Sequence, residues 1–363
     1  MISEKLTDLA ANTTYMQNGK SGSKPSFVKG EGDGSFTVQF PEVKTFNSLF
    51  IAVDGENASV SFGTGGKVVY SGGGYCTFPE ITTDTLNVEV KCEGKWKVKS
   101  LGVYDAPASS EQAVAVTEAA DLLDGKLSRD DFANVSAVVL HANVLFDSNG
   151  TVSYAAVNGE SGESYFSRCV NALKSLTTVP IYMQADAMNT EGDVPEPSYV
   201  RYHALRTNRN TSVNNLSTAV RRYGLQGMHI DFSDSSTEST AIYYMGEFAQ
   251  AWRNTGTLLA VTWNAESWER SAWLADTFAK VFRDDMTGEA YINYIILNTG
   301  GASYEDVVKF CSAKSDIDLT LALPCEDGIE GVAAFAIDCG ATIALTHYNS
   351  SGARALKAVS SER

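Results

Sequence analysis

Beyond residue 107 the sequence alternates between amphipathic helical segments and short apolar runs. The helical segments are residues 111–123, 162–176, 212–224, 241–254, 271–284, 304–314 and 329–340. The apolar runs are residues 135–146, 178–186, 227–232, 258–264, 291–298, 319–324 and 342–348. Strands that alternate with helices pair in parallel, because each helix carries the chain back across the sheet. Seven such strands predict an α/β, TIM-like barrel of seven or eight strands over residues 108–363. An eighth strand is either KVKSLGVYD, residues 97–105, or absent.

A different pattern precedes the barrel. Residues 27–107 consist of short β-type runs such as SFTVQF, ASVSFG and LNVEVKC, separated by glycine-containing and acidic turns. Without a helical run among them, these strands predict a small antiparallel β-sandwich. The chain is therefore expected to be multidomain, with the β-sandwich followed by the barrel.

Residues 1–26 are predicted to be an N-terminal arm and linker. Ile2, Leu6 and Leu9 recur at helical spacing, and KSGSKPS behind them is typical of a flexible segment. An apolar stripe on so short a helix needs a partner surface. We therefore expect the arm to attach the chain to a partner subunit or another copy, and its removal to leave the melting temperature unchanged.

The charge of the chain argues against two classes of partner. With 44 acidic and 28 basic side chains, the formal net charge is −16, which repels nucleic acid and anionic membranes. No apolar run approaches the roughly 18 residues of a membrane span, and the N-terminus lacks the pattern of a signal peptide. The six cysteines form no C-x-x-C pair, so they predict neither a zinc site nor a disulfide framework. No metal and no cofactor are expected.

The segment AVRRYGLQGMHIDFSD contains the most informative motif. Two segments precede it, FANVSAVVLHANVLFDSNGTVSY and TVPIYMQAD. In chain order, the three segments resemble the second, third and fourth strands of glycoside hydrolase family 18, the chitinase-like barrels. The family pattern on the fourth strand is D-G-x-D-x-D-x-E. On this pattern, Gly227 and Asp231 match, whereas Gln226, His229 and Ser233 replace two aspartates and the glutamate.

The resemblance implies a damaged active site. In that family the glutamate protonates the glycosidic oxygen while the N-acetyl group of the substrate attacks. A serine hydroxyl cannot act as a general acid near neutral pH, so Ser233 predicts a catalytically inactive barrel. If the protein is active, Asp231 and Glu266 are the candidate catalytic residues; Asp234 and Glu238 are poorer substitutes.

Other residues are candidates for ligand binding at the mouth of the barrel. Strand periodicity predicts that His229, Asp231 and Ser233 share the inward face, with His229 and Asp231 buried and hydrogen-bonded. His141, His229 and His347 lie on barrel strands, and a polar interior is the expected role in preference to a metal site. Candidate sugar-binding residues at the mouth are Trp263, Glu266, Trp268 and Tyr348. Trp273, in a helical run, is expected in the core.

A second resemblance concerns the first twenty residues. MISEKLTDLAANTTYMQNGK is similar to the start of tail and other virion-associated proteins of phages from Gram-positive bacteria. It implies a virion structural protein made in the host cytoplasm, a homo-oligomer among other virion proteins that binds host glycan. The alternative hypothesis is an active glycoside hydrolase acting on bacterial cell-wall or surface glycans.

Overall fold

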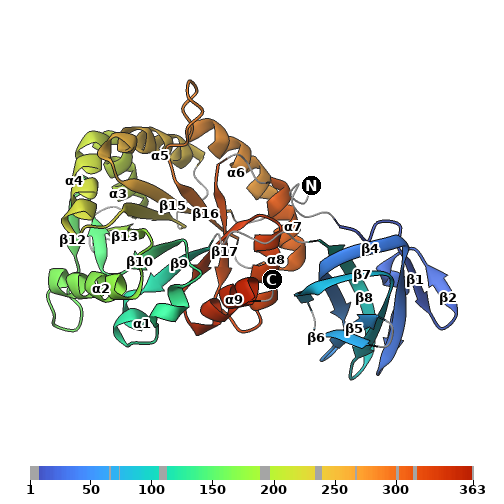
Figure 1. The fold of residues 1–363 in the computed structure, drawn as a ribbon. Helices are drawn as coiled ribbons and strands as arrows, with labels where there is room; N and C mark the ends of the chain where they lie inside the picture. The colour runs from blue at the N-terminus through green and yellow to red at the C-terminus, as the bar shows by residue number, and fades with distance from the viewer. Residues whose placement is uncertain are drawn as a thin grey trace. The chain divides into compact units, whose positions relative to one another are not determined.

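The computed structural model of the 363-residue chain describes residues 8–64, 67–72, 74–105, 113–188, 197–233, 239–265, 268–299, 302–313 and 317–361 (Figure 1). The chain divides into two compact units. The first is Met1–Ser110 with Glu330–Gly340 and Lys357–Arg363, and the second is Glu111–Ile329 with Ala341–Leu356.

The first unit contains an antiparallel sheet of eight strands. These are β1 (Thr14–Gln17), β2 (Lys20–Gly22), β3 (Lys29–Glu31), β4 (Gly34–Asp54), β5 (Ser59–Thr64), β6 (Lys67–Gly72), β7 (Gly74–Lys91) and β8 (Lys95–Tyr104). β4 is long enough to pair with β1, β7 and β8, so several of the expected short runs are parts of one strand. Alternate residues such as Phe36, Val38 and Phe40 point into one core. The antiparallel strands of the predicted small β-sandwich are confirmed, and they belong to one eight-stranded sheet.

The N-terminal segment corrects the expectation of a helical arm and linker. Thr14–Gln17 and Lys20–Gly22 form a β-hairpin that pairs with β4. Asn18 and Gly19 make its turn with φ of 50° and 73°, the left-handed values that a two-residue hairpin loop requires. The Asn-Gly pair between two short runs was the signal for this turn. Residues 1–7, with Ile2 and Leu6, lie outside the described residues.

The second unit contains a closed parallel barrel. Its strands are β9 (Ala113–Glu118), β10 (Ala137–His141), β13 (Ile181–Ala187), β14 (Gly227–Phe232), β15 (Leu258–Asn264), β16 (Tyr294–Asn298), β17 (Leu319–Pro324) and β18 (Thr342–Thr346). Each strand pairs in parallel with the next in this list, and the last strand, β18, pairs with the first, β9, to close the ring. A short hairpin, β11 (Val144–Phe146) with β12 (Val152–Tyr154), adds to the edge of β13. The predicted TIM-like barrel is confirmed, with eight strands.

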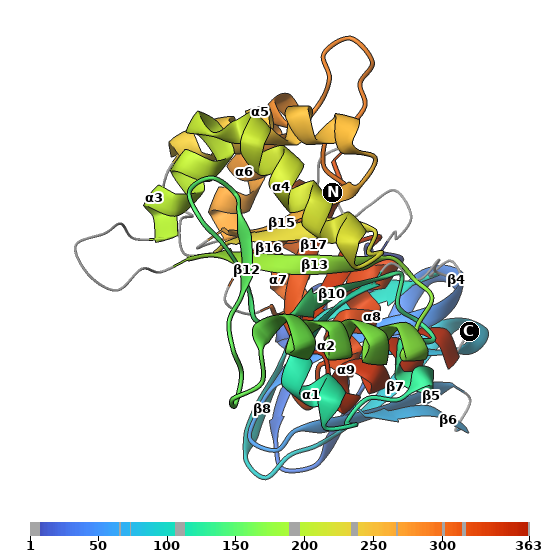
Figure 2. The same cartoon turned by 90° about the vertical axis from the view of Figure 1, so that its left-hand side faces the viewer.

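Helices alternate with these strands along the chain. They are α1 (Ala119–Leu123), α2 (Gly162–Leu176), α3 (Pro197–Tyr202), α4 (Arg209–Arg222), α5 (Ser239–Trp252), α6 (Trp268–Val281), α7 (Tyr304–Ala313), α8 (Glu330–Asp338) and α9 (Ser350–Ser361). A turn of π-helix, His203–Thr207, links α3 to α4. Figure 2 shows α4 and α5 on one side of the barrel strands and α1 and α2 on the other. Among the described residues, no helix is long and apolar enough to span a membrane.

The eighth strand corrects another expectation. It is β9, Ala113–Glu118, which the sequence predicted as the start of a helix, and KVKSLGVYD belongs to β8 of the antiparallel sheet. β9 pairs with β10 on one edge and β18 on the other, and its consecutive residues Ala113, Val114 and Ala115 are all buried, so both of its faces are covered. A strand covered on both faces has no polar alternation and therefore reads like part of an apolar helix.

The barrel interior is apolar in its middle layer. Tyr182 and Tyr294 meet there edge to face, with ring centroids 5.1 Å apart. Small and branched side chains from the other strands fill the remaining space: Val114, Ala137, Val139, Ala260, Ile296, Ala322 and Ala344. This layer closes the barrel below its C-terminal end, so any ligand site has to lie above it.

Candidate functional site

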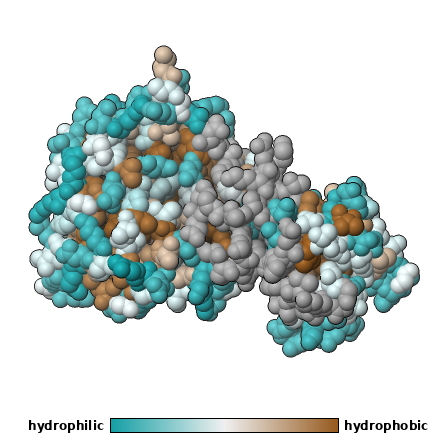
Figure 3. All heavy atoms as spheres, viewed as in Figure 1, coloured by the Kyte–Doolittle hydropathy of each residue, from teal (hydrophilic) through white to brown (hydrophobic). Residues whose placement is uncertain are grey.

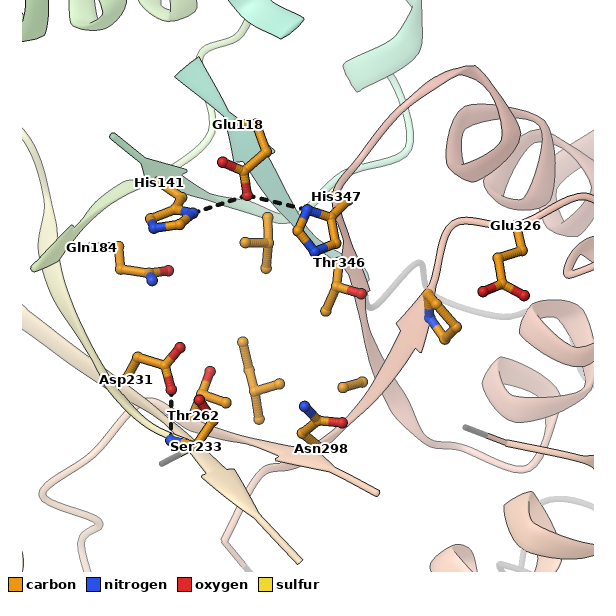
Figure 4. A pocket seen from close by; sticks show the side chains of 14 residues that line it. Glu118, His141, Gln184, Asp231, Ser233, Thr262, Asn298, Glu326, Thr346 and His347 are labelled. Carbon is orange, nitrogen blue, oxygen red and sulfur yellow. Dashed lines mark hydrogen bonds and ion pairs between the residues drawn. The ribbon is translucent and has the colours of Figure 1, made fainter. Parts of the chain in front are cut away.

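A cavity of about 420 Å³ opens at the C-terminal ends of the barrel strands (Figure 4). Its lining consists of Val116, Glu118, His141, Gln184, Asp231, Ser233, Thr262, Ile296, Asn298, Ala322, Pro324, Glu326, Thr346 and His347. These residues come from strand ends on all sides of the barrel, because side chains two residues apart share the inward face. Ligands of barrels of this type bind at this end.

Glu118, at the end of β9, binds two histidines. Its Oε1 lies 2.9 Å from Nδ1 of His141 and 3.2 Å from Nδ1 of His347. His347 has a φ of 53°, a left-handed conformation that costs a non-glycine residue free energy. Two contacts hold it there. Its side chain binds Glu118, and the next residue, Tyr348, donates its backbone N–H to the carbonyl of Val116. Figure 4 shows these three side chains on one side of the pocket.

His141 is the centre of a small charged network. Its Nε2 lies 3.3 Å from Oδ2 of Asp186, whose other oxygen accepts a hydrogen bond from Gln184 at 3.1 Å. Hydrogen bonds to Asp186 and Glu118 raise the pKa of His141 to about 10, so it is an imidazolium at neutral pH. Burial opposes ionisation of Asp186, but the bonds to His141 and Gln184 outweigh it and leave the pKa of Asp186 below its ordinary value.

His229 lies deeper, on β14, and is only 1% exposed. Its Nε2 is 2.9 Å from the hydroxyl of Thr262. Within the described residues, Nδ1 has no hydrogen-bond partner. Burial lowers the pKa of His229 to about 4, against the opposing attraction of Asp231 and Asp186. The prediction that His229 is buried and hydrogen-bonded is therefore confirmed, with a neutral imidazole.

Asp231 and Ser233 follow on the same strand face and both line the pocket. Asp231 is half-buried, not fully buried as predicted, and its Oδ1 accepts the backbone N–H of Ser233 at 2.7 Å. Arg201 donates from Nη1 to the backbone oxygen of Asp231 at 3.4 Å, and Asn264 donates to that of Ser233. Figure 4 places Asp231, Ser233 and Thr262 across the pocket from Glu118. The inward face inferred from strand periodicity is confirmed.

Trp263 does not reach the mouth of the barrel, contrary to expectation. It is 0% exposed, stacks on Phe232 with centroids 5.2 Å apart, and meets Phe278 edge to face. The inward positions of β15 are Thr262 and Asn264, so strand parity turns Trp263 outward under the helices.

Tyr348 is likewise buried and is not part of the pocket. It is 0% exposed, packs against Phe132, and donates its hydroxyl to the backbone oxygen of Asp131. It serves the barrel wall, and the preceding residue, His347, faces the pocket instead. Trp273, expected in the core, is 47% exposed.

Other candidates fall outside the described residues. Glu266 is one, together with Asp234 and Glu238. Trp268 begins α6, but its side chain belongs to the same undescribed group.

Several pocket residues were missed at the sequence level. Glu118 and Gln184 lie near the C-terminal ends of their strands, where the strands reach the pocket. A polar residue at that point was the available signal for Gln184, whereas the strand of Glu118 was read as a helix. In the part of the chain that is described, no group of three or more His, Cys, Asp or Glu side chains is arranged to hold a metal ion.

No family model matches the chain, and no curated protein matches it. Solved structures similar to it include a glycoside hydrolase family 18 chitinase from Flavobacterium johnsoniae, 11% identical, with a TM-score of 0.45 over 70% of this chain and 94% of that one. A chitinase from Chromobacterium violaceum is 12% identical, with a TM-score of 0.47 over 69% and 100%. A putative chitinase A from Streptomyces coelicolor is 11% identical, with a TM-score of 0.45 over 70% and 98%. Likeness at this level says nothing about the activity of this chain.

Proposed function

We propose that the barrel binds carbohydrate without hydrolysing it, as part of a virion structural or appendage protein. The observation that carries the first half of this proposal is Ser233, which lines the pocket at the end of β14. There the sequence resemblance to family 18 expects the catalytic glutamate. A pocket that keeps its position and its polar lining, but not its proton donor, can hold a sugar and leave the glycosidic bond intact.

The titrating groups of the pocket support this proposal. A general acid works best when its pKa lies near the working pH. The pKa of Asp186 is shifted down, so this carboxyl is ionised. The imidazolium of His141, with a pKa of about 10, holds its proton too tightly to be an efficient donor near neutral pH. Neither group is tuned to protonate a leaving oxygen.

The polar lining suits the hydroxyl groups of a sugar. Gln184, Thr262, Asn298 and Thr346 offer amide and hydroxyl groups around one cavity, and Val116 and Ile296 offer apolar surface. A sugar needs both kinds of contact, because its ring carries polar edges and apolar faces. The volume of about 420 Å³ is that of a small-molecule site.

The competing function is hydrolysis with Glu266 as the acid. This residue follows Ala265, a buried residue directly after β15, whose N–H binds the carbonyl of Asn298. The decisive assay is release of reducing sugar from N-acetylglucosamine oligomers and from Gram-positive cell walls. We expect no turnover. Turnover by the natural chain that is lost in Glu266→Gln or Asp231→Asn would establish a hydrolase.

The virion assignment rests on the resemblance of the first twenty residues to phage tail-type proteins. The proposed partners are other virion proteins and further copies of this chain, and the proposed location is the particle. Copurification with intact particles at a fixed stoichiometry is the expected result. Particles that lack the chain after density-gradient purification would contradict the assignment, and would leave the carbohydrate-binding proposal to its own test.

A further inference from the structure

The charge of the pocket is unbalanced toward the negative. Glu118, Asp231 and Glu326 line it, and Asp186 lies behind His141. The opposing groups are the imidazoles of His141 and His347, and no lysine or arginine occurs among the described residues that line the cavity. Three lining carboxylates, with Asp186 behind His141, therefore stand against two imidazoles. Hydrogen bonds to Asp186 and Glu118 raise the pKa of His141 to about 10.

The positive charge of His141 is already engaged. One imidazole nitrogen binds Glu118 and the other binds Asp186, so this cation neutralises its own neighbours and offers nothing to a ligand. Among the described lining residues, a ligand anion would meet carboxylates and no lysine or arginine. The pocket therefore disfavours acidic sugars.

Asp231 lies on the opposite side. Within the described residues, its side chain accepts one hydrogen bond, from the backbone N–H of Ser233, and Arg201 donates to its backbone oxygen. A carboxylate has about four acceptor positions, so most of those on Asp231 are available. Figure 4 shows Asp231 on the pocket wall opposite the Glu118 pair, near Ser233 and Thr262.

His229 lies next to the lining residue Thr262 and has one unsatisfied polar atom within the described part of the chain. Its imidazole is 1% exposed, yet Nδ1 has no hydrogen-bond partner among the described residues. An unsatisfied buried nitrogen costs free energy unless a partner arrives from elsewhere. The groups that act on this imidazole electrostatically are Asp231 and His141, which line the pocket, and Asp186, which binds His141.

We propose that the pocket prefers a sugar unit with a free, protonated amine, such as a non-acetylated hexosamine, to its N-acetylated or acidic counterparts. This inference rests on the carbohydrate-binding function proposed above and specifies its ligand class. The ammonium group carries hydrogen-bond donors and a positive charge, which the open acceptor positions of Asp231 complement. An acetyl group removes that charge, and a carboxyl group reverses it.

The test compares glucosamine oligomers with N-acetylglucosamine oligomers of the same length by isothermal titration calorimetry, below the pKa of the sugar amine. We expect the free-amine oligomer to bind about fivefold more tightly, the size of one partly exposed charge pair. The preference should shrink as salt is added, because salt screens such pairs.

Variants separate the pocket from the general negative charge of the protein. Asp231→Asn should abolish the preference, so that the two oligomers bind with equal affinity. The matched control is Asp285→Asn, which removes one carboxylate from an exposed turn outside the cavity and should keep the preference.

Each remaining outcome refutes a defined part of the account. Equal or tighter binding of the acetylated oligomer would overturn the ligand class and leave carbohydrate binding standing. A preference that persists in Asp231→Asn would overturn the role of the pocket. Binding of neither oligomer would refute the proposed function itself, together with this inference.

Discussion

Two histidines of the barrel have the same intrinsic chemistry and opposite electrostatic surroundings. His141 lies between two carboxylates, which stabilise its charged form, whereas His229 is sealed in the interior and remains neutral. Their pKa values move apart, to about 10 and about 4. Both shifts couple protonation to folding, so each residue predicts a pH dependence of stability with its own sign.

His229 should make the protein sensitive to mild acid. The unfolded chain takes up this proton near pH 6.5, but the folded chain does so only near pH 4. Stability is therefore lost as the pH falls through this window, by about 2–3 kcal/mol at its end. In His229→Gln, urea unfolding between pH 7 and pH 4 should show a correspondingly smaller loss. If the free energy of unfolding falls equally with pH in the two proteins, protonation of this imidazole is not the cause of the acid sensitivity.

His141 should act in the opposite direction. Its folded pKa is raised from 6.5 to about 10, so its contribution is complete below pH 6.5 and disappears as the pH rises through 10. Because its side chain is 34% exposed, solvent screening reduces this contribution to about 1–2 kcal/mol. His141→Gln should unfold at lower urea than the natural chain at pH 6 and at nearly the same urea at pH 10. If the variant is less stable than the natural chain by the same amount at every pH, the loss of stability comes from packing instead.

At the scale of elements, the sequence predicted most of the barrel because its strands and helices carry clear periodicity. Gly227–Phe232 and Leu258–Asn264 have the predicted bounds, and α2 matches its segment throughout. β9 was missed because a strand covered on both faces has no polar alternation to reveal it. The alternation of side chains along a strand placed Asp231 correctly on the inward face. The same alternation, applied to β15, would have placed Trp263 on the outward face. By contrast, the contacts of Glu118 with His141 and His347 join β9 to β10 and to the end of β18. Such contacts between distant segments depend on the tertiary structure and have no local sequence signal.

The β1–β2 hairpin should contribute to stability, in contrast to the expectation for a detachable arm. Tyr15 is 3% exposed and packs in the β-domain core, whereas its neighbour Met16 is 37% exposed. Tyr15→Ala should lower the free energy of unfolding by about 3 kcal/mol, and Met16→Ala by less than about 1 kcal/mol. Chemical denaturation of the two variants measures this. A harmless Tyr15→Ala would mean that the hairpin is peripheral after all.

Gly227 at the start of β14 has a packing role that does not depend on ligand. A Cβ added there would lie 2.5 Å from the ring of Tyr182 and 3.0 Å from Cβ of Leu258. Gly227→Ala should therefore destabilise the protein by about 1–3 kcal/mol. The control is Gly94→Ala, where no atom lies within 4 Å of an added Cβ. Equal melting temperatures for the two variants would show that the neighbours of Gly227 move to accept the added methyl group without loss of stability.

At the scale of the whole molecule, the chain combines an antiparallel β-domain with a parallel barrel whose pocket is polar and negatively charged. Figure 3 shows a mainly hydrophilic periphery on the barrel face in view, as expected for a folded domain in water. The net charge of −16 adds to the local charge of the pocket and raises the local concentration of cationic ligands. The net charge and the carboxylates of the pocket thus act in the same direction.

We propose that this pocket holds a sugar and does not cleave it. Equilibrium dialysis of the natural chain against a glucosamine or N-acetylglucosamine oligomer, with mass spectrometry of the oligomer on both sides, tests binding and integrity together. We expect accumulation of the oligomer on the protein side at its full length, and loss of the free-amine preference in Asp231→Asn. Shortened oligomers, or equal concentrations on the two sides of the membrane, would contradict it.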